Sequence, residues 1–233
     1  ISIVGNFDER AALDALEELL SGYPAEGGPE TDYPEIPKPE RGTSEFYMDV
    51  EEPRLSIGYM APPAFDRDQA ALRVIGALLG GGEHARLQKA LGSEGADIAS
   101  SVSTKLFSAS DKSALIIDCV TRDIDAALEV IEGEIERLRT EPPGEESVRL
   151  ARNRVIGSIA LGTQTNLSRA LVLSVDYLLS GQVDTLDTFL EQVSRVSRDD
   201  VLRVSREYLV EPVVALVRPG QSAERERAVR RGI

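Results

Sequence analysis

The 233-residue sequence is poor in the side chains that most enzymes use for metal binding and nucleophilic catalysis. It contains one histidine, His84, one cysteine, Cys119, and no tryptophan. Catalytic zinc sites commonly use two or three histidines, so a single imidazole falls short of that ligand set. A single cysteine also excludes an intrachain disulfide, and it leaves the redox compartment and the localisation open.

Charge and hydropathy exclude two further classes of function. The formal net charge is -14 and the isoelectric point is near 4.6. A negative field repels phosphate backbones, which argues against a nucleic-acid partner. No apolar run approaches the ~18 to 20 residues needed to cross a bilayer, so we expect no membrane span. The chain opens on "ISIVGN" with neither a methionine nor a secretory leader, and we expect it to be part of a longer protein.

What the sequence does contain is a pattern of paired strands and amphipathic helices. Apolar periodicity and turn residues predict the following strands: 1–5, 45–50, 54–62, 96–107, 113–120 and 212–217. The same signals predict these helices: 9–20, 65–79, 83–91, 124–138, 145–161, 166–180, 184–192 and one from residue 197. Two hairpins are expected, 45–50 with 54–62 and 96–107 with 113–120. Because strands pair in hairpins and helices follow, we predict an α+β fold.

Two capping boxes and two stretches outside the predicted helices and strands refine this prediction. Asp66 with Gln69, and Ser197 with Asp200, have the spacing that caps a helix start. Residues 21–42 are rich in proline and glycine, and we expect them to wrap over the domain as a long connection. We therefore predict one domain over residues 1–219, followed by a charged tail or linker over residues 220–233.

The stretch "GALLGGGEHARLQKAL", residues 76–91, combines three glycines with the only histidine. A phosphate-binding loop would follow a strand and end in Gly-Lys-Ser/Thr, whereas these glycines follow an apolar helix pattern. Neither H-E-x-x-H nor H-x-x-E-H surrounds His84, and no G-x-S-x-G motif occurs. Cys119 lies in an apolar strand pattern, where thiols are usually inert. The residues alone therefore indicate no catalytic or metal-binding side chain.

The segment "LLGGGEHARLQKAL" resembles the glycine-loop helix of the pitrilysin (insulinase-like) zinc peptidases, which include the mitochondrial processing peptidases. The typical family segment is L-G-G-G-x-x-S-R-L-F-x-x-L-R-E-x-x-G-L-A-Y-S-V. The order of the other segments agrees: "ISIVGNFDE", "RLSIGYMAPP", "DRDQAALRVIGALLGGG" and the run from "SALIIDCV" to "RNRVIGSI". The resemblance covers residues 1 to about 219, and it concerns the family's second, inactive-type domain.

This resemblance implies a LuxS/pitrilysin-peptidase-like domain, with helices packed on one face of an antiparallel sheet. In the family, two such domains form a half, and two halves close around a peptide-holding chamber. The zinc motif H-x-x-E-H belongs to the preceding domain of the catalytic half and has no match here. The family's Arg-x6-Tyr pair, which assists the scissile carbonyl, falls on Gly92 and Ala99, neither of which can stabilise an oxyanion.

The resemblance implies a non-catalytic domain that lines a peptide-binding chamber and packs against a catalytic domain or subunit of the same family. The residues expected to line the chamber are those of the glycine turn: Gly80, Gly81, Gly82, Glu83, His84 and Arg86. Peptide is the expected ligand, a homodimer is possible, and any zinc belongs to the parent protein or partner. Three alternatives stay open: an active endopeptidase with H-x-x-E-H upstream, a scaffold or assembly subunit, and, for the glycine turn, an ordinary helix corner.

Overall fold

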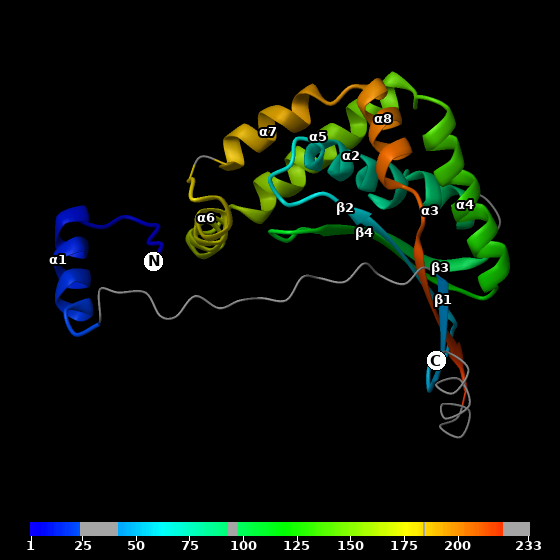
Figure 1. The fold of residues 1–233 in the computed structure, drawn as a ribbon, viewed down its shortest axis with the longest axis horizontal. Coiled ribbons are helices and arrows are strands. Elements are labelled where there is room, and N and C mark those ends of the chain that lie inside the picture. The colour runs from blue at the N-terminus through cyan, green and yellow to red at the C-terminus, as the bar shows by residue number, and fades with distance from the viewer. Residues whose placement is uncertain (24–41, 93–96, 184, 221–233) are drawn as a thin grey trace.

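The computed structural model describes residues 1–23, 42–92, 97–183 and 185–220 of the chain (Figure 1). The helices are α1 (Glu9–Leu20), α2 (Gln69–Gly80), α3 (Arg86–Leu91), α4 (Ile124–Thr140), α5 (Glu145–Gly162), α6 (Asn166–Ser180), α7 (Thr185–Arg195) and α8 (Arg198–Tyr208). The strands are β1 (Gly42–Met48), β2 (Arg54–Ala61), β3 (Ala99–Phe107), β4 (Ser113–Thr121) and β5 (Val213–Pro219). The predicted α+β class is therefore confirmed.

The five strands form one sheet in the order β1-β5-β2-β4-β3. β3 and β4 form the predicted antiparallel hairpin, in which Leu106 lies opposite Leu115. The predicted hairpin between the first two strands is wrong, because β5 lies between β1 and β2. β5 pairs antiparallel with β2 and parallel with β1, so the last strand of the chain completes the sheet. A pairing between strands this far apart in sequence leaves no local turn signal.

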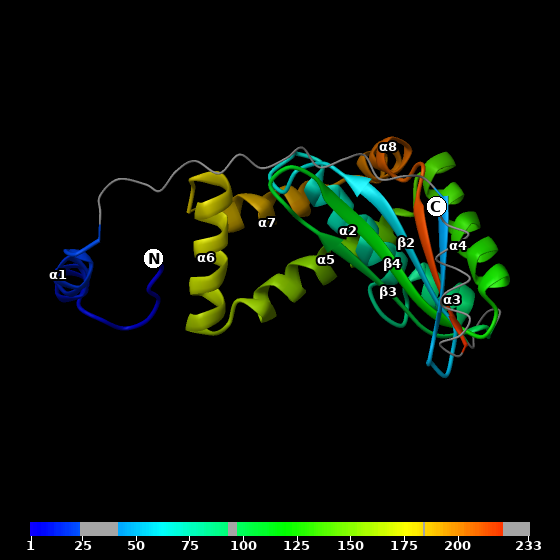
Figure 2. The same ribbon diagram turned by 60° about the horizontal axis from the view of Figure 1, so that its bottom comes forward.

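Helices α2, α3, α4, α5 and α8 cover one face of the sheet (Figures 1 and 2). β2 alternates buried and more exposed residues, and its buried side chains Leu55, Ile57 and Tyr59 face the helices. α2 lies at the centre of this helical layer and is buried on nearly all sides. Its core residues Leu72 and Leu79 are fully enclosed by the sheet and the neighbouring helices.

Of the two predicted capping boxes, the one at the start of α8 is confirmed and the one at the start of α2 is not. Ser197 and Asp200 form the predicted capping box of α8, each accepting a backbone N–H of the other residue. The predicted cap by Asp66 is wrong, because α2 begins at Gln69 and the carboxylate of Asp66 accepts the backbone N–H of Asp68. The Gln69 amide donates to the Pro62 and Pro63 carbonyl oxygens and to Ser113 Oγ, and so anchors the start of α2 to the end of β2 and to β4.

The N-terminal segment lies apart from this body in both views (Figures 1 and 2). The predicted helix is present as α1, and Asp8 caps it by accepting the N–H of Ala11. The predicted strand over residues 1–5 is not formed, because no strand of the described chain lies beside it. Ile1 is 88% exposed, and α1 has no buried residue. Most of the predicted connection 21–42 and all but one residue of the tail 220–233 lie outside the described residues.

Candidate functional site

The part of the chain that the structure describes holds no group of three His, Cys, Asp or Glu side chains able to bind a metal ion. His84 is exposed in the turn between α2 and α3. Cys119 is buried in β4, and burial raises the pKa of its thiol to about 11, so it is protonated at neutral pH. No helix in the described ranges is long and apolar enough to span a membrane.

The three glycines of the turn lie in close contact with the protein itself. A Cβ on Gly80 would lie 2.7 Å from Thr104 Cγ2, and one on Gly81 would lie 2.4 Å from the Ala77 carbonyl oxygen. Gly82 has φ +115°, a conformation that favours glycine, and a Cβ there would lie 2.5 Å from Arg154 Nη2. The absence of side chains therefore lets α2 end against β3 and lets the Arg154 guanidinium lie over the turn.

The polar residues of the turn divide into two groups. The side chains of Glu83 and His84 are exposed. Arg86 is half-buried at the start of α3, and its Nη1 lies 3.6 Å from Oε2 of the buried Glu134. Glu134 Oε1 also accepts a hydrogen bond of 2.5 Å from Arg137 Nη1. Arg86 therefore joins α3 to α4. Of the polar residues predicted to line the chamber, Glu83 and His84 have side chains that face solvent.

Gly92 and Ala99, at the positions of the family's Arg-Tyr pair, belong to the end of α3 and the start of β3. Gly92 is buried at the end of α3, where its N–H donates to the Gln88 carbonyl oxygen. A Cβ on Gly92 would lie 2.6 Å from that same oxygen, so the backbone would have to shift before an arginine could be accommodated. Ala99 is half-buried at the start of β3.

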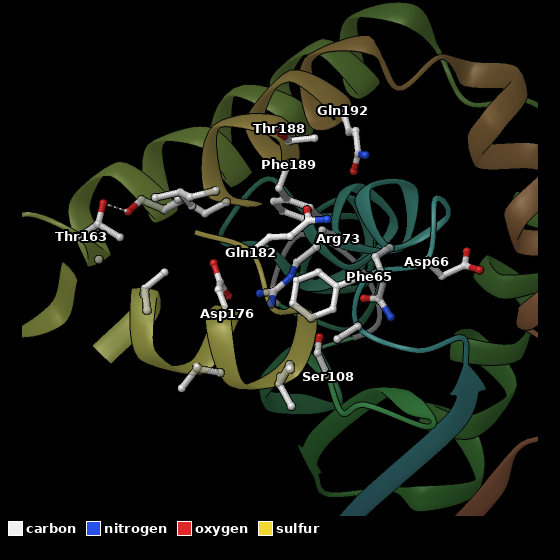
Figure 3. Close-up of a pocket in the computed structure, with 18 residues that line it drawn as sticks. Phe65, Asp66, Arg73, Ser108, Thr163, Asp176, Gln182, Thr188, Phe189 and Gln192 are labelled. Atoms are coloured by element: carbon white, nitrogen blue, oxygen red, sulfur yellow. Dashed lines mark hydrogen bonds between the residues drawn. The ribbon is translucent and has the colours of Figure 1, made fainter. Parts of the chain in front are cut away.

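Two adjoining pockets lie beside the helical layer. The larger, of about 540 Å³, lies among the start of α2, the end of α5, α6 and α7 (Figure 3). The smaller, of about 310 Å³, lies between the glycine turn, β3 and α5. Arg73 and Ile159 line both pockets. Sequence reasoning missed Arg73 as a site residue, although an arginine inside the apolar run "QAALRVIGALL" was a usable signal.

The smaller pocket is cationic. Its charged lining residues in the described ranges are Arg73, Lys105 and Arg154, with no carboxylate among them. Thr104 and Ser158 add hydroxyl groups, of which the Thr104 hydroxyl donates to the Gly76 carbonyl oxygen. Burial lowers the pKa of Arg73, which remains a cation at neutral pH. Nothing in the sequence around Arg154 indicated that it would lie over the glycine turn.

The face of the sheet opposite the helices presents a mixture of small polar side chains and larger apolar ones, which include Met60, Ile116, Val120, Val213 and Val217. Ser103, Asp118, Ser56 and Ala215 lie side by side across β3, β4, β2 and β5. The Ser56 hydroxyl donates to Asp118 Oδ1 at 2.7 Å. These positions alternate with the buried residues of the core and are more exposed than them. The result is a mixed polar and apolar surface, bounded by the edge strands β1 and β3.

Comparison with known proteins places this geometry in a family. A family model described as the peptidase M16 inactive domain matches residues 1–155. A protease from Helicobacter pylori has a TM-score of 0.82 at 20% identity, covering 93% of this chain and 54% of that one. A peptidase M16 inactive domain from Pseudomonas fluorescens has a TM-score of 0.77 at 17% identity, covering 92% and 52%. A chain of complex III2 from Candida albicans has a TM-score of 0.76 at 19% identity, covering 91% and 53%.

The matches to solved structures show the fold of the chain, and the family model shows which family it belongs to. No curated protein matches the sequence. The chain spans about half the length of the three solved structures. At these levels of identity the solved structures support the fold alone. The family model is independent of them and covers 155 of the 233 residues, which is more than half of the chain.

Proposed function

Since the chain belongs to the peptidase M16 inactive-domain family, as the sequence resemblance implied, we propose that it is a non-catalytic domain of a zinc metalloendopeptidase. In this proposal it lines a peptide-binding chamber and packs against a catalytic domain or subunit. The observation that carries the proposal is the uncovered face of the sheet. Helices bury one face, whereas the opposite face is more exposed, and an extended chain can add as a further strand at the sheet edges, which are β1 and β3.

The chemistry of the described residues supports a wall and argues against a catalytic centre. Zinc needs several nitrogen, sulfur or carboxylate ligands around one point, and His84 stands alone in an exposed turn. The residues present do not fit the metal, so in this proposal zinc is held by the catalytic domain or subunit. Glu83 and His84 contribute polar side chains to the chamber wall, and Gly80 to Gly82 shape the turn that presents them.

Exposed apolar helices support the packing against a partner. α1 and α6 have no buried residue, and each exposes large apolar side chains. On α1 and the residues before it these are Ile1, Ile3, Phe7, Leu13, Leu19 and Leu20. On α6 they are Leu167, Leu171, Val175, Tyr177, Leu178 and Leu179. Exposed apolar surface of this extent is typical of an interface with another domain or chain.

The first test of this proposal measures zinc and hydrolysis in the purified 233-residue chain. We expect no stoichiometric zinc by mass spectrometry of metals, and no cleavage of a quenched fluorescent peptide. A labelled, uncleaved peptide should bind and change its fluorescence anisotropy. His84→Ala should leave the zinc content unchanged. Stoichiometric zinc, with hydrolysis that a chelator abolishes, would contradict the proposal.

The proposal leaves two properties of the parent protein to separate tests. An H-x-x-E-H motif upstream in the same reading frame would make this chain the second domain of an active zinc half. A scaffold or assembly role is the second candidate, and the likeness to a chain of complex III2 favours it. A scaffold predicts self-association or a stable complex without peptide binding. Sedimentation of the chain with and without peptide distinguishes these outcomes.

A further inference from the structure

We propose that the two adjoining pockets form one subsite for a peptide segment in which an Asp or Glu side chain lies next to bulky apolar residues. The carboxylate lies in the cationic pocket beside the glycine turn, and the apolar residues fill the pocket among α2, α5, α6 and α7. This inference rests on the proposed peptide-binding function, because it states which class of peptide the chamber wall binds preferentially.

Of the three cations of the smaller pocket, Lys105 has an ion-pair partner in the described part of the chain, whereas Arg73 and Arg154 have none. The side chains of Arg73 and Arg154 are exposed to solvent, and neither guanidinium forms a hydrogen bond with a described residue. Lys105 Nζ lies 3.9 Å from Asp118 Oδ2, and both side chains are well exposed. The pocket therefore gathers three cations on one part of a chain whose net charge is -14, which favours an anionic ligand there. A carboxylate is the group whose geometry matches a guanidinium fork.

The backbone of the glycine turn makes room for this arrangement. Arg154 lies so close over Gly82 that a Cβ there would be 2.6 Å from Nη1 and 2.5 Å from Nη2. Gly81 also lines the pocket. A larger residue at position 82 would therefore displace the guanidinium as well as strain the backbone. The turn and the Arg154 guanidinium therefore form one structural unit. This packing explains the glycines of the turn better than the alternative that they only end a helix.

The larger pocket supplies the apolar half of the subsite. Figure 3 shows Phe65 and Arg73 pointing into the same space, with Phe189 on the α7 side and Asp176 on the α6 side. The remaining apolar walls come from Ala64, Ile159, Val172, Val175, Leu179 and Leu186.

Charge fixes the orientation of the bound segment. Asp66 and Asp176 line the larger pocket, whereas the charged residues that line the smaller one, among those the structure describes, are all cations. An acidic side chain is therefore disfavoured among α6 and α7 and favoured beside Gly81. Arg73, which lines both pockets, lies at the junction between the apolar and the anionic parts of the ligand.

The experiment compares peptides and variants in one anisotropy assay with the 233-residue chain. The probe is a fluorescein-labelled peptide of about eight residues with one glutamate between leucine and phenylalanine. Matched peptides carry glutamine or lysine in place of the glutamate. We expect the glutamine peptide to bind about tenfold more weakly than the glutamate peptide, and the lysine peptide more weakly still.

Arginine variants test whether Arg73 and Arg154 cause the preference for the glutamate peptide. Arg73→Gln with Arg154→Gln should weaken the glutamate peptide about tenfold and leave the glutamine peptide unchanged. Arg149→Gln is the matched control, since Arg149 lies on the same helix as Arg154, pairs with Glu146 and lines neither pocket. Thermal unfolding checks that each variant is folded. If the double variant is not folded, the single variants and the peptide series still decide the question.

Three results would overturn the inference. Equal binding of the glutamate, glutamine and lysine peptides would remove the carboxylate preference while leaving the proposed peptide wall intact. Displacement of the peptide by an equal concentration of inorganic phosphate would assign the pocket to a small anion. Absence of binding by every peptide would remove the proposed function together with the subsite.

Discussion

Asp68 and Arg203 form a two-pronged ion pair that joins the start of α2 to α8. Arg203 Nη2 lies 2.7 Å from Asp68 Oδ1, and Nη1 lies 3.0 Å from Oδ2. The Tyr208 hydroxyl donates to the same carboxylate at 3.4 Å. Asp68 is 2% exposed, so its charge depends on these partners rather than on water. Because α2 carries the glycine turn and Arg73, this pair also orients the proposed subsite.

Arg203→Met should lower the free energy of unfolding by about 2 to 3 kcal/mol. The substitution leaves a buried carboxylate without its main partner, and the loss is below that of a fully buried pair because Arg203 is half exposed. Urea unfolding followed by circular dichroism measures the change. Arg198→Met, an exposed position on the same helix, should change stability by less than about 0.5 kcal/mol. Equal effects of the two substitutions would contradict a structural role for the ion pair.

Acid should remove the contribution of this pair. The hydrogen bond from Arg203 holds the pKa of Asp68 below its ordinary value. A lowered folded-state pKa gives stability that is fully present above the unfolded-state pKa of about 3.9 and is lost as pH falls through the lower folded-state value. The stability difference between wild type and Arg203→Met should therefore shrink as pH falls below about 4. A difference that stays constant from neutral pH to pH ~2 would contradict this account.

Gly80→Ala should destabilise the protein, whereas Gly133→Ala should not. A Cβ on Gly80 would lie 2.8 Å from the backbone nitrogen of Thr104, which cannot move away independently of β3. We expect a loss of about 1 to 3 kcal/mol from this overpacking. Gly133 lies inside α4 with nothing within 4 Å of an added Cβ, so alanine should stabilise by up to about 1 kcal/mol. Thermal unfolding of both variants checks the pair of predictions.

Cys119 should not react with thiol reagents while the protein is folded. Burial in β4 raises the pKa of its thiol to about 11, and the side chain is 2% exposed. At neutral pH only a very small fraction of the thiol is therefore ionised to the reactive thiolate, and the protein covers the sulfur. We expect iodoacetamide labelling to be slow in buffer and rapid in concentrated urea, as measured by mass spectrometry. Fast labelling of the folded chain would contradict the buried placement.

Local patterns predicted the elements that depend on neighbouring residues. The helix starting at Ile124 and the hairpin of β3 and β4 follow from apolar periodicity and turn residues. The pairing of β1 with β5 could not be predicted in this way, because the two strands come from opposite ends of the domain. The start of α2 was also misplaced, since Asp66 and Gln69 bond to the turn before the helix and to β4.

The candidate site shows the same division. The glycine turn was recognisable as a sequence motif, but the reason for each glycine is a contact with Thr104, Ala77 or Arg154 that only packing creates. Arg73 and Arg154 are 81 positions apart and became a site when α2 and α5 were brought together.

The order of the family's motifs was enough to determine the peptidase family to which the chain belongs, and the scarcity of histidine and cysteine limited the metal ligands that it can offer. Ligand chemistry depends on which side chains exist, and that is a property of composition. Tertiary structure alone decided which cations gather around one pocket, which face of the sheet the helices cover and which apolar side chains are exposed. These properties depend on distances between remote residues, and the distances arise only when the core packs.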